Sequence, residues 1–209
     1  MTQLIKRMSA FLLCLMLLMG AFPATALAAP DWPSGVSVQA ESGIVIDADT
    51  GTVLWGQNIH NQYFPASITK IMTALIVIET CSLDETVTFS HNAVFNVEAG
   101  SSNAGINEGD KLSVKDCLYA LLLKSANEAA NALAEHVAGS TEAFADMMNV
   151  KAKELGCTDT VYDNPHGLDF DAYAGDLHST AADVAKVVQY AMTNDTFRAA
   201  VGAGAPPSR

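Results

Sequence analysis

Basic residues are scarce in this sequence. Its 209 residues include 11 lysines and arginines against 23 aspartates and glutamates, and the formal net charge is −12 at pH 7. Nucleic acids and anionic membrane surfaces attract proteins that carry basic patches. The chain is therefore a poor candidate for binding either surface, and we expect no nucleic-acid partner.

Cysteine is also sparse, and no Cys-x-x-Cys pair occurs among the four cysteines. Cys14 lies in an N-terminal apolar run, whereas Cys81, Cys117 and Cys157 are odd in number and widely spaced. This spacing does not indicate a disulfide framework or a zinc site. None of the five histidines forms a metal-binding pair at helical spacing. We expect free or core thiols, no metal and no cofactor.

The N-terminus carries an apolar run that is too short to span a membrane comfortably. Lys6 and Arg7 precede the apolar residues 11–19, and small residues follow at Ala26 and Ala28. This order is typical of a secretory signal peptide. We predict a signal peptide at 1–28, a proline-containing linker at 29–35 and one domain at 36–209. The protein is then exported, and we expect no membrane attachment apart from this peptide.

The pattern of apolar residues predicts a β-hairpin followed by a mainly helical region, which is an α/β (α+β) chain. Alternation predicts strands at 43–47 and 52–55 around an Asp-Thr-Gly turn. Helical periodicity and capping residues predict helices at 67–78, 116–123, 128–137, 141–155 and 181–192. About 180 residues after the leader are enough for one domain with its own core.

Ser67 and Lys70 open the most apolar of these helices, in the stretch Pro65-Ala66-Ser67-Ile68-Thr69-Lys70. Residues three apart on a helix lie on one side, so the hydroxyl is expected beside the amine. Burial and the positive end of the helix dipole both favour the neutral amine, which can accept the proton of a serine nucleophile. The alternative is a capping serine and a solvent-facing lysine. The pattern alone is expected about once by chance in a chain of this length.

Ser125-Ala126-Asn127 forms the second candidate cluster, in a tight connection between two apolar helices. Packing at such a junction would fix the directions of the hydroxyl and the amide. The same Ser-x-Asn pattern at Ser90 and Ser101 lies in polar segments, where turn formation explains it. The alternative role for Ser125 is that of an N-cap for the helix that begins near Glu128.

Taken together, these motifs resemble those of the low-molecular-mass penicillin-binding proteins, the serine D-alanyl-D-alanine carboxypeptidases. That resemblance implies a β-lactamase/transpeptidase-like fold with a helical subdomain. It implies that Ser67 attacks the D-Ala-D-Ala bond of peptidoglycan stem peptides, Lys70 acts as base, Ser125 relays the proton and Asn127 binds the substrate amide. β-Lactams would acylate Ser67. The segments that carry the resemblance are 43–47, 65–74, 100–110, 124–130, 164–168 and 179–183.

The sequence departs from that family in one motif. No Lys-Thr-Gly occurs in the 209 residues, and the chain ends in a Gly/Ala/Pro-rich tail at 202–209. In the family, this motif lies on a sheet-edge strand that binds the substrate carboxylate and completes the oxyanion hole. We therefore expect a truncated domain with an incomplete antiparallel sheet and impaired activity.

Three alternatives to a carboxypeptidase remain at this stage. A class A β-lactamase needs a Glu-x-x-Leu-Asn segment, which the residues after Glu154 do not match. An endopeptidase of the same family would share every motif. A non-catalytic fragment, or a penicillin- or muropeptide-binding protein, is favoured by the missing third motif.

Overall fold

The structure, a computed structural model, describes residues 38–169 and 176–203. The predicted signal peptide at 1–28, the linker at 29–35 and residues 204–209 of the tail lie outside this part. One compact unit begins at Gln39. Among the described residues, no helix combines the length and the apolarity that crossing a membrane requires.

The first described element is the predicted β-hairpin, formed by β1 (Gly43–Ile46) and β2 (Val53–Gln57). The strands are antiparallel with Gly43 opposite Gln57, and the register shifts between Val45 and Ile46. Asp47 holds the turn, because its carboxylate accepts hydrogen bonds from the backbone N–H of Thr50 at 2.8 Å and from its hydroxyl at 2.7 Å. The predicted hairpin is confirmed.

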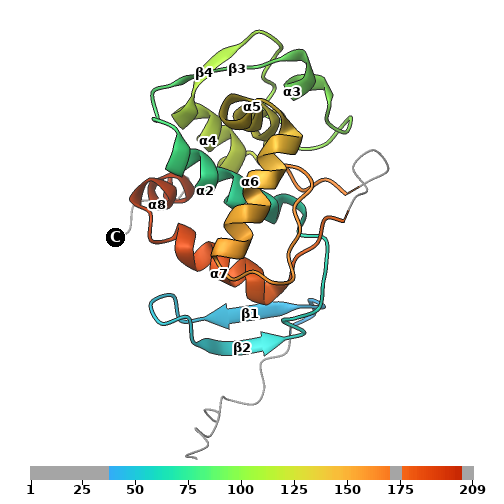
Figure 1. Cartoon of the computed structure of the whole chain (residues 1–209), viewed down its shortest axis with the longest axis vertical. Coiled ribbons are helices and arrows are strands. Elements are labelled where there is room, and N and C mark those ends of the chain that lie inside the picture. The colour runs from blue at the N-terminus through green and yellow to red at the C-terminus, as the bar shows by residue number, and fades with distance from the viewer. Residues whose placement is uncertain (1–37, 170–175, 204–209) are drawn as a thin grey trace, which may run out of the picture. The chain divides into compact units, whose positions relative to one another are not determined.

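Seven α-helices and one 3-10 turn make up nearly half of the described residues (Figure 1). Side-chain caps start several helices: Ser113 accepts from the N–H of Asp116, Ser140 from that of Ala143, and Thr180 from that of Asp183. The 3-10 turn η1 spans Ala66–Ile68, and the helices are α2 (Thr69–Thr80), α3 (His91–Phe95), α4 (Val114–Leu123), α5 (Asn127–Ala138), α6 (Thr141–Glu154), α7 (Ala181–Ala191) and α8 (Asp195–Gly202).

Helix α2 is the centre of the helical region. It contacts α4, α5, α6, α7 and α8, and α7 in turn contacts β1 of the hairpin (Figure 1). Its residues from Met72 to Val77 are all buried, which confirms the prediction of a buried central helix. The predicted start at Ser67 is wrong by two residues, because η1 precedes the α-helix.

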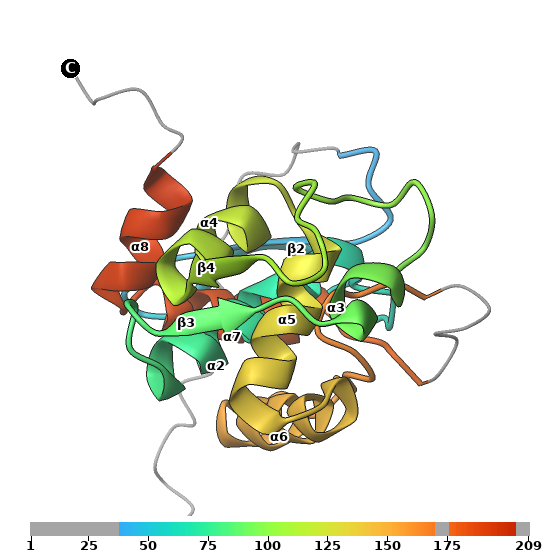
Figure 2. The same ribbon diagram turned by 90° about the horizontal axis from the view of Figure 1, so that it is seen from above.

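A second antiparallel pair, β3 (Thr86–Thr88) and β4 (Lys111–Ser113), lies beside α5 (Figure 2). The described residues thus form two two-stranded sheets within a mainly helical unit, in agreement with the predicted mixed class. The three cysteines at 81, 117 and 157 are free, as predicted, and the last two are buried.

The segment around Asn164 packs over the start of α2. The Asn164 side chain accepts from the N–H of Gly167 at 2.6 Å and donates to the carbonyl of Leu168 at 2.9 Å. The Thr73 hydroxyl of α2 donates to the carbonyl of Pro165 at 2.7 Å. Gly167 has φ +87°, and a Cβ atom on it would overlap the carbonyl oxygen of Ala66. Glycine alone allows this close approach between two backbones.

The core packing predicts that alanine substitution lowers the free energy of unfolding far more at one phenylalanine than at another. Phe144 is fully buried, whereas Phe95 is 63% exposed. We expect Phe144→Ala to lower the free energy of unfolding by about 3–5 kcal/mol, because it leaves a cavity in the core. Phe95→Ala should cost less than about 1 kcal/mol. Urea unfolding followed by circular dichroism measures both, and similar losses for the two variants would contradict this packing.

The close approach at Gly167 predicts that alanine there lowers the stability more than alanine at Gly139 does. Gly139 also has a positive φ, +82°, but a Cβ atom there would meet nothing within 4 Å. Gly139→Ala should therefore cost only the left-handed strain, about 1–2 kcal/mol. Gly167→Ala adds the overlap with Ala66 and should cost about 3 kcal/mol or more. If the two variants melt at the same temperature, the contact between the segment and η1 is not as described.

Candidate active site

Three of the four predicted site residues meet at one point. The Lys70 amine donates to the Ser67 hydroxyl oxygen at 3.1 Å. The Ser125 hydroxyl donates to the same Ser67 oxygen at 2.8 Å, although the two serines are 58 residues apart. The side chains come from α2, from η1 and from the turn between α4 and α5. Ser67 Oγ therefore accepts a hydrogen bond from each of the other two side chains.

Lys70 is enclosed by the fold and is only 2% exposed. Its amine also donates to the backbone carbonyl of His166 at 2.9 Å. Burial lowers the pKa of Lys70 from 10.5 to about 8, and the negative charge of Glu128 partly opposes that shift. Close to neutral pH, a useful fraction of the amine is therefore uncharged and able to accept a proton.

Ser67 does not act as a helix cap. The N-cap of η1 is Pro65, that of α2 is Ile68, and neither helix start has a side-chain cap bond. The residue before it, Ala66, has a positive φ of +47°. Ser67 itself is exposed, so its hydroxyl is held by Lys70 and Ser125 on one side and open to solvent on the other.

Ser125 is also not the cap proposed as its alternative role. Helix α5 takes Ala126 as N-cap, again without a side-chain cap bond. The turn is fixed by the N–H groups of Lys124 and Ala126, which both donate to the carbonyl of Ala120 at 3.2 and 3.1 Å. Ser125 has φ +56°. Strained backbone at a non-glycine residue occurs often at functional sites and costs about 1–3 kcal/mol.

Asn127, the fourth predicted residue, bonds to a neighbouring loop. Its side-chain N–H group donates to the Ser101 hydroxyl at 3.0 Å, and its backbone N–H donates to the carbonyl of Ser102 at 3.0 Å. The side chain is 1% exposed, and its carbonyl oxygen has no partner within the described chain. As placed here, Asn127 braces the 101–102 loop against the Ser125 turn.

Two further residues adjoin the site and were not predicted. His166 is 2% exposed, and its Nδ1 accepts from the N–H of Leu168 at 3.1 Å. Burial, followed by the charge of Lys70, lowers its pKa to about 3, so the ring stays neutral. Glu128 is 2% exposed and accepts from the N–H of Ala104 at 2.6 Å.

Different signals bear on these two residues. An acid directly after Ser-x-Asn at the start of an alanine-rich helix could have drawn attention to Glu128. His166 contacts Lys70 through its backbone carbonyl. A backbone contact does not depend on the type of residue, so residue chemistry does not predict it. The family resemblance includes 164–168 but assigns His166 no role.

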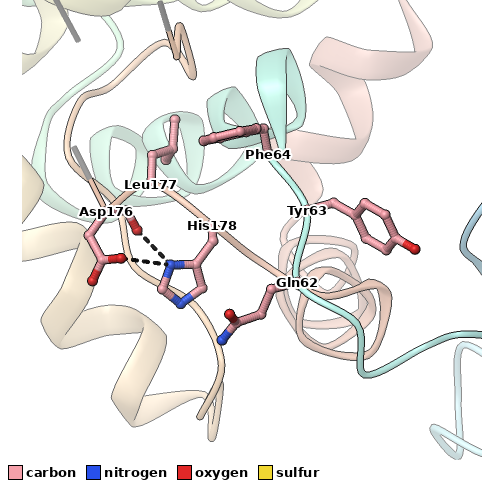
Figure 3. A pocket seen from close by; sticks show the side chains of 6 residues that line it. All are labelled: Gln62, Tyr63, Phe64, Asp176, Leu177 and His178. Carbon is pink, nitrogen blue, oxygen red and sulfur yellow. Dashed lines mark hydrogen bonds and ion pairs between the residues drawn. The ribbon is translucent and has the colours of Figure 1, made fainter. Parts of the chain in front are cut away.

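A pocket of about 420 Å³ lies beside the chain that leads into η1 (Figure 3). Phe64 and Leu177 lie together on one side of it. On the other side, His178 Nδ1 lies 2.6 Å from the carbonyl oxygen of Asp176. None of the four predicted site residues lines this pocket. The candidate active site is therefore the cluster around Ser67 and not the pocket.

Comparison with known proteins identifies the family. Residues 25–201 match the family described as D-alanyl-D-alanine carboxypeptidase. The chain is 33% identical over 192 residues to the D-alanyl-D-alanine carboxypeptidase DacF of Bacillus subtilis, covering 88% of this chain and 48% of the relative. It is 38% identical over 172 residues to DacC of Escherichia coli, covering 78% and 42%. The chain thus spans about half the length of these relatives.

Solved structures agree as well. Penicillin binding protein 6B of Escherichia coli superimposes with a TM-score of 0.74 at 33% identity, covering 82% of this chain and 56% of the other. A variant of the Streptomyces K15 DD-transpeptidase gives a TM-score of 0.74 at 34% identity, covering 79% and 66%. The fold is that of the penicillin-binding DD-peptidases, as the sequence motifs predicted. On the match of the family model and of these relatives, the chain belongs to the D-alanyl-D-alanine carboxypeptidase family of serine peptidases, S11.

Proposed function

We propose that the protein is a serine D-alanyl-D-alanine carboxypeptidase that removes the terminal D-alanine from peptidoglycan stem pentapeptides. The observation that carries this proposal is the pair of hydrogen bonds that Ser67 Oγ accepts from Lys70 and Ser125. A hydroxyl between a partly neutral amine and a second hydroxyl has both a base and a proton relay within reach. Membership of the family supplies the substrate class.

In the proposed reaction, the neutral Lys70 amine takes the proton of Ser67 while Ser67 Oγ bonds to the carbonyl carbon of the D-Ala-D-Ala peptide. Ser125 then passes a proton to the nitrogen of the departing D-alanine, and the C–N bond breaks. Water attacks the ester on Ser67 and releases the shortened peptide. The backbone N–H of Ser67 donates to the developing oxyanion. A β-lactam would acylate the same oxygen.

Asn127 is proposed to bind the substrate amide, with one condition. Its side-chain carbonyl oxygen is buried and has no hydrogen-bond partner among the described residues. A substrate N–H group reaches that oxygen only if the loop at Ser101 and Ser102 shifts. Until it shifts, Asn127 acts on the site by positioning the Ser125 turn.

The third motif of the family is proposed to decide how active these 209 residues are by themselves. The sequence holds no Lys-Thr-Gly, so the 209 residues lack the donor and the carboxylate-binding groups of that motif. Loss of one oxyanion donor typically costs about 10²–10³ in rate. We therefore propose that this polypeptide forms the acyl-enzyme slowly. We also propose that residues 1–28 direct it out of the cytoplasm, where the substrate lies.

The lowered pKa of Lys70 predicts the pH dependence of Ser67 reactivity. Because the neutral amine is the base, the rate of Ser67 labelling by a fluorescent fluorophosphonate should rise with pH, with a midpoint of about 8, and level off above it. Lys70→Arg should label at least about 100-fold more slowly, because guanidinium stays protonated. Lys111→Arg, an exposed lysine in β4, is the matched control and should behave as wild type. A labelling rate that ignores pH between about 7 and 9 would contradict Lys70 as the base.

The substrate proposal predicts a slow but Ser67-dependent release of D-alanine. Incubated with a stem pentapeptide, the purified 209-residue chain should release D-alanine at least about 100-fold more slowly than DacC assayed beside it. Ser67→Ala should abolish that release. Release at the DacC rate would refute the proposed impairment, and release unaffected by Ser67→Ala would refute the nucleophile. A cross-linked dimer as substrate separates carboxypeptidase from endopeptidase activity.

A further inference from the structure

A second cluster of reactive side chains lies at the end of α2 that is remote from Ser67. Cys81, Glu85 and His136 each offer one ligand atom, and these atoms all lie within 4.8 Å of one another. The imidazole Nε2 of His136 is 3.0 Å from the carboxylate Oε2 of Glu85. Helix α2 has 12 residues, so at 1.5 Å per residue about 18 Å of helix separates this cluster from the active site.

The fold holds each of the three residues in place. Cys81 caps the C-terminus of α2, and its N–H donates to the carbonyl of Val77 at 2.9 Å. The N–H of Ser82 donates to Oε1 of Glu85 at 2.6 Å, which fixes the carboxylate and leaves Oε2 directed at His136.

His136 lies in the last turn of α5. Helix α5 packs on both α2 and β3, as Figure 2 shows. His136 thus comes from a packed helix, whereas Cys81 and Glu85 lie at the two ends of the turn that joins α2 to β3.

The chemistry of the donors selects the ion. Thiolate, imidazole and carboxylate together are ligands of Zn²⁺ and related borderline ions, whereas Ca²⁺ and Mg²⁺ take oxygen alone. In a tetrahedral zinc site the donor atoms lie roughly 3.3–3.6 Å apart, given metal–ligand distances of about 2.0–2.3 Å. His136 Nε2 and Glu85 Oε2, at 3.0 Å, are slightly closer than this. All three ligand atoms lie within 4.8 Å of one another, so modest side-chain movements would place them around one ion.

We propose that Cys81, Glu85 and His136 bind one divalent ion of the zinc class. The ion replaces the proton shared by His136 Nε2 and Glu85 Oε2, the Cys81 thiol releases its proton to solvent, and water fills the fourth position. His136 and Glu85 side chains are 24% and 43% exposed, so the ion has a path from solvent. The site fastens the end of α2 to α5 and is independent of the reaction at Ser67.

The chain contains its own control for this proposal. His91 Nδ1 and Glu108 Oε2 form a similar pair at 2.9 Å, with no cysteine in the group. A bare His–Glu pair is expected to bind zinc-class ions weakly, because it supplies only two ligands. Cys117, a free thiol that is fully buried, is the matching control for the cysteine.

Cobalt(II), which substitutes for zinc and absorbs light when bound to thiolate, tests the site in the purified chain after chelator treatment. We expect one Co²⁺ per chain with a thiolate-to-metal charge-transfer band. Cys81→Ser should remove the band, and His136→Gln should weaken Co²⁺ binding by about 10-fold or more. Cys117→Ala and His91→Gln should leave the band unchanged. Zn²⁺ at a hundredfold excess over its Kd should raise the Tm of the wild type by about 5 °C but not that of Cys81→Ser.

A readout without any substitution accompanies this titration. Zn²⁺ should slow the alkylation of Cys81 by a maleimide in the wild-type chain. Absence of the charge-transfer band, a band that survives Cys81→Ser, or unchanged alkylation with Zn²⁺ would each overturn the proposal. Equal losses in His91→Gln and His136→Gln would do the same. None of these measurements depends on peptidase activity, so failure here leaves the proposed function untouched.

Discussion

A lysine amine enclosed by protein is the constraint on which the described site depends. Burial disfavours the charge of Lys70, so each of its polar contacts must come from the fold itself. Ser67 supplies a hydroxyl and His166 supplies a carbonyl. The Asn164 segment lies over the start of α2 and presents that carbonyl, and Gly167 lets it come close enough. The arrangement of Ser67, the Asn164 segment and Gly167 thus meets the hydrogen-bonding needs of the buried Lys70 amine.

The same burial has a cost in stability that depends on pH. The pKa of Lys70 in the fold, about 8, lies below its ordinary value of 10.5. Below pH 8 the amine is charged in both the folded and the unfolded state, and the folded state carries the full penalty, about 3 kcal/mol. Between pH 8 and 10.5 the penalty declines as the folded amine loses its proton first. The proposed role of Lys70 as a base near neutral pH therefore comes with a lower free energy of unfolding.

The sequence predicted those parts of the fold and the site that depend on short-range pattern. The spacing of Ser67 and Lys70 placed their side chains together because one helical turn joins them. The hairpin and the central helix followed from alternation and from a long apolar run. The position of Ser125 against Ser67 spans 58 residues, and only the family motifs, not the local pattern, could suggest it.

The parts that sequence reasoning missed also have physical causes. Helix α3, of five residues, and α8 are short, and their caps at Ser90 and Asn194 look like ordinary turn residues. The sequence does not reveal the cluster of Cys81, Glu85 and His136, because the histidine is far along the chain from the other two residues. His136 meets Glu85 across 51 residues, through the packing of α5 against β3.

The left-handed backbone at Ser125 restricts which amino acids evolution can place there. Two aliphatic side chains carry a hydroxyl, serine and threonine, so either would serve the chemistry. Threonine is branched at Cβ, and a branched residue at φ +56° is a severe conformational outlier. Glycine or asparagine would accept the dihedral angle but would lose the alcohol. Substitution at this position is therefore restricted, because serine alone combines this backbone conformation with the hydroxyl that the proposed proton relay needs.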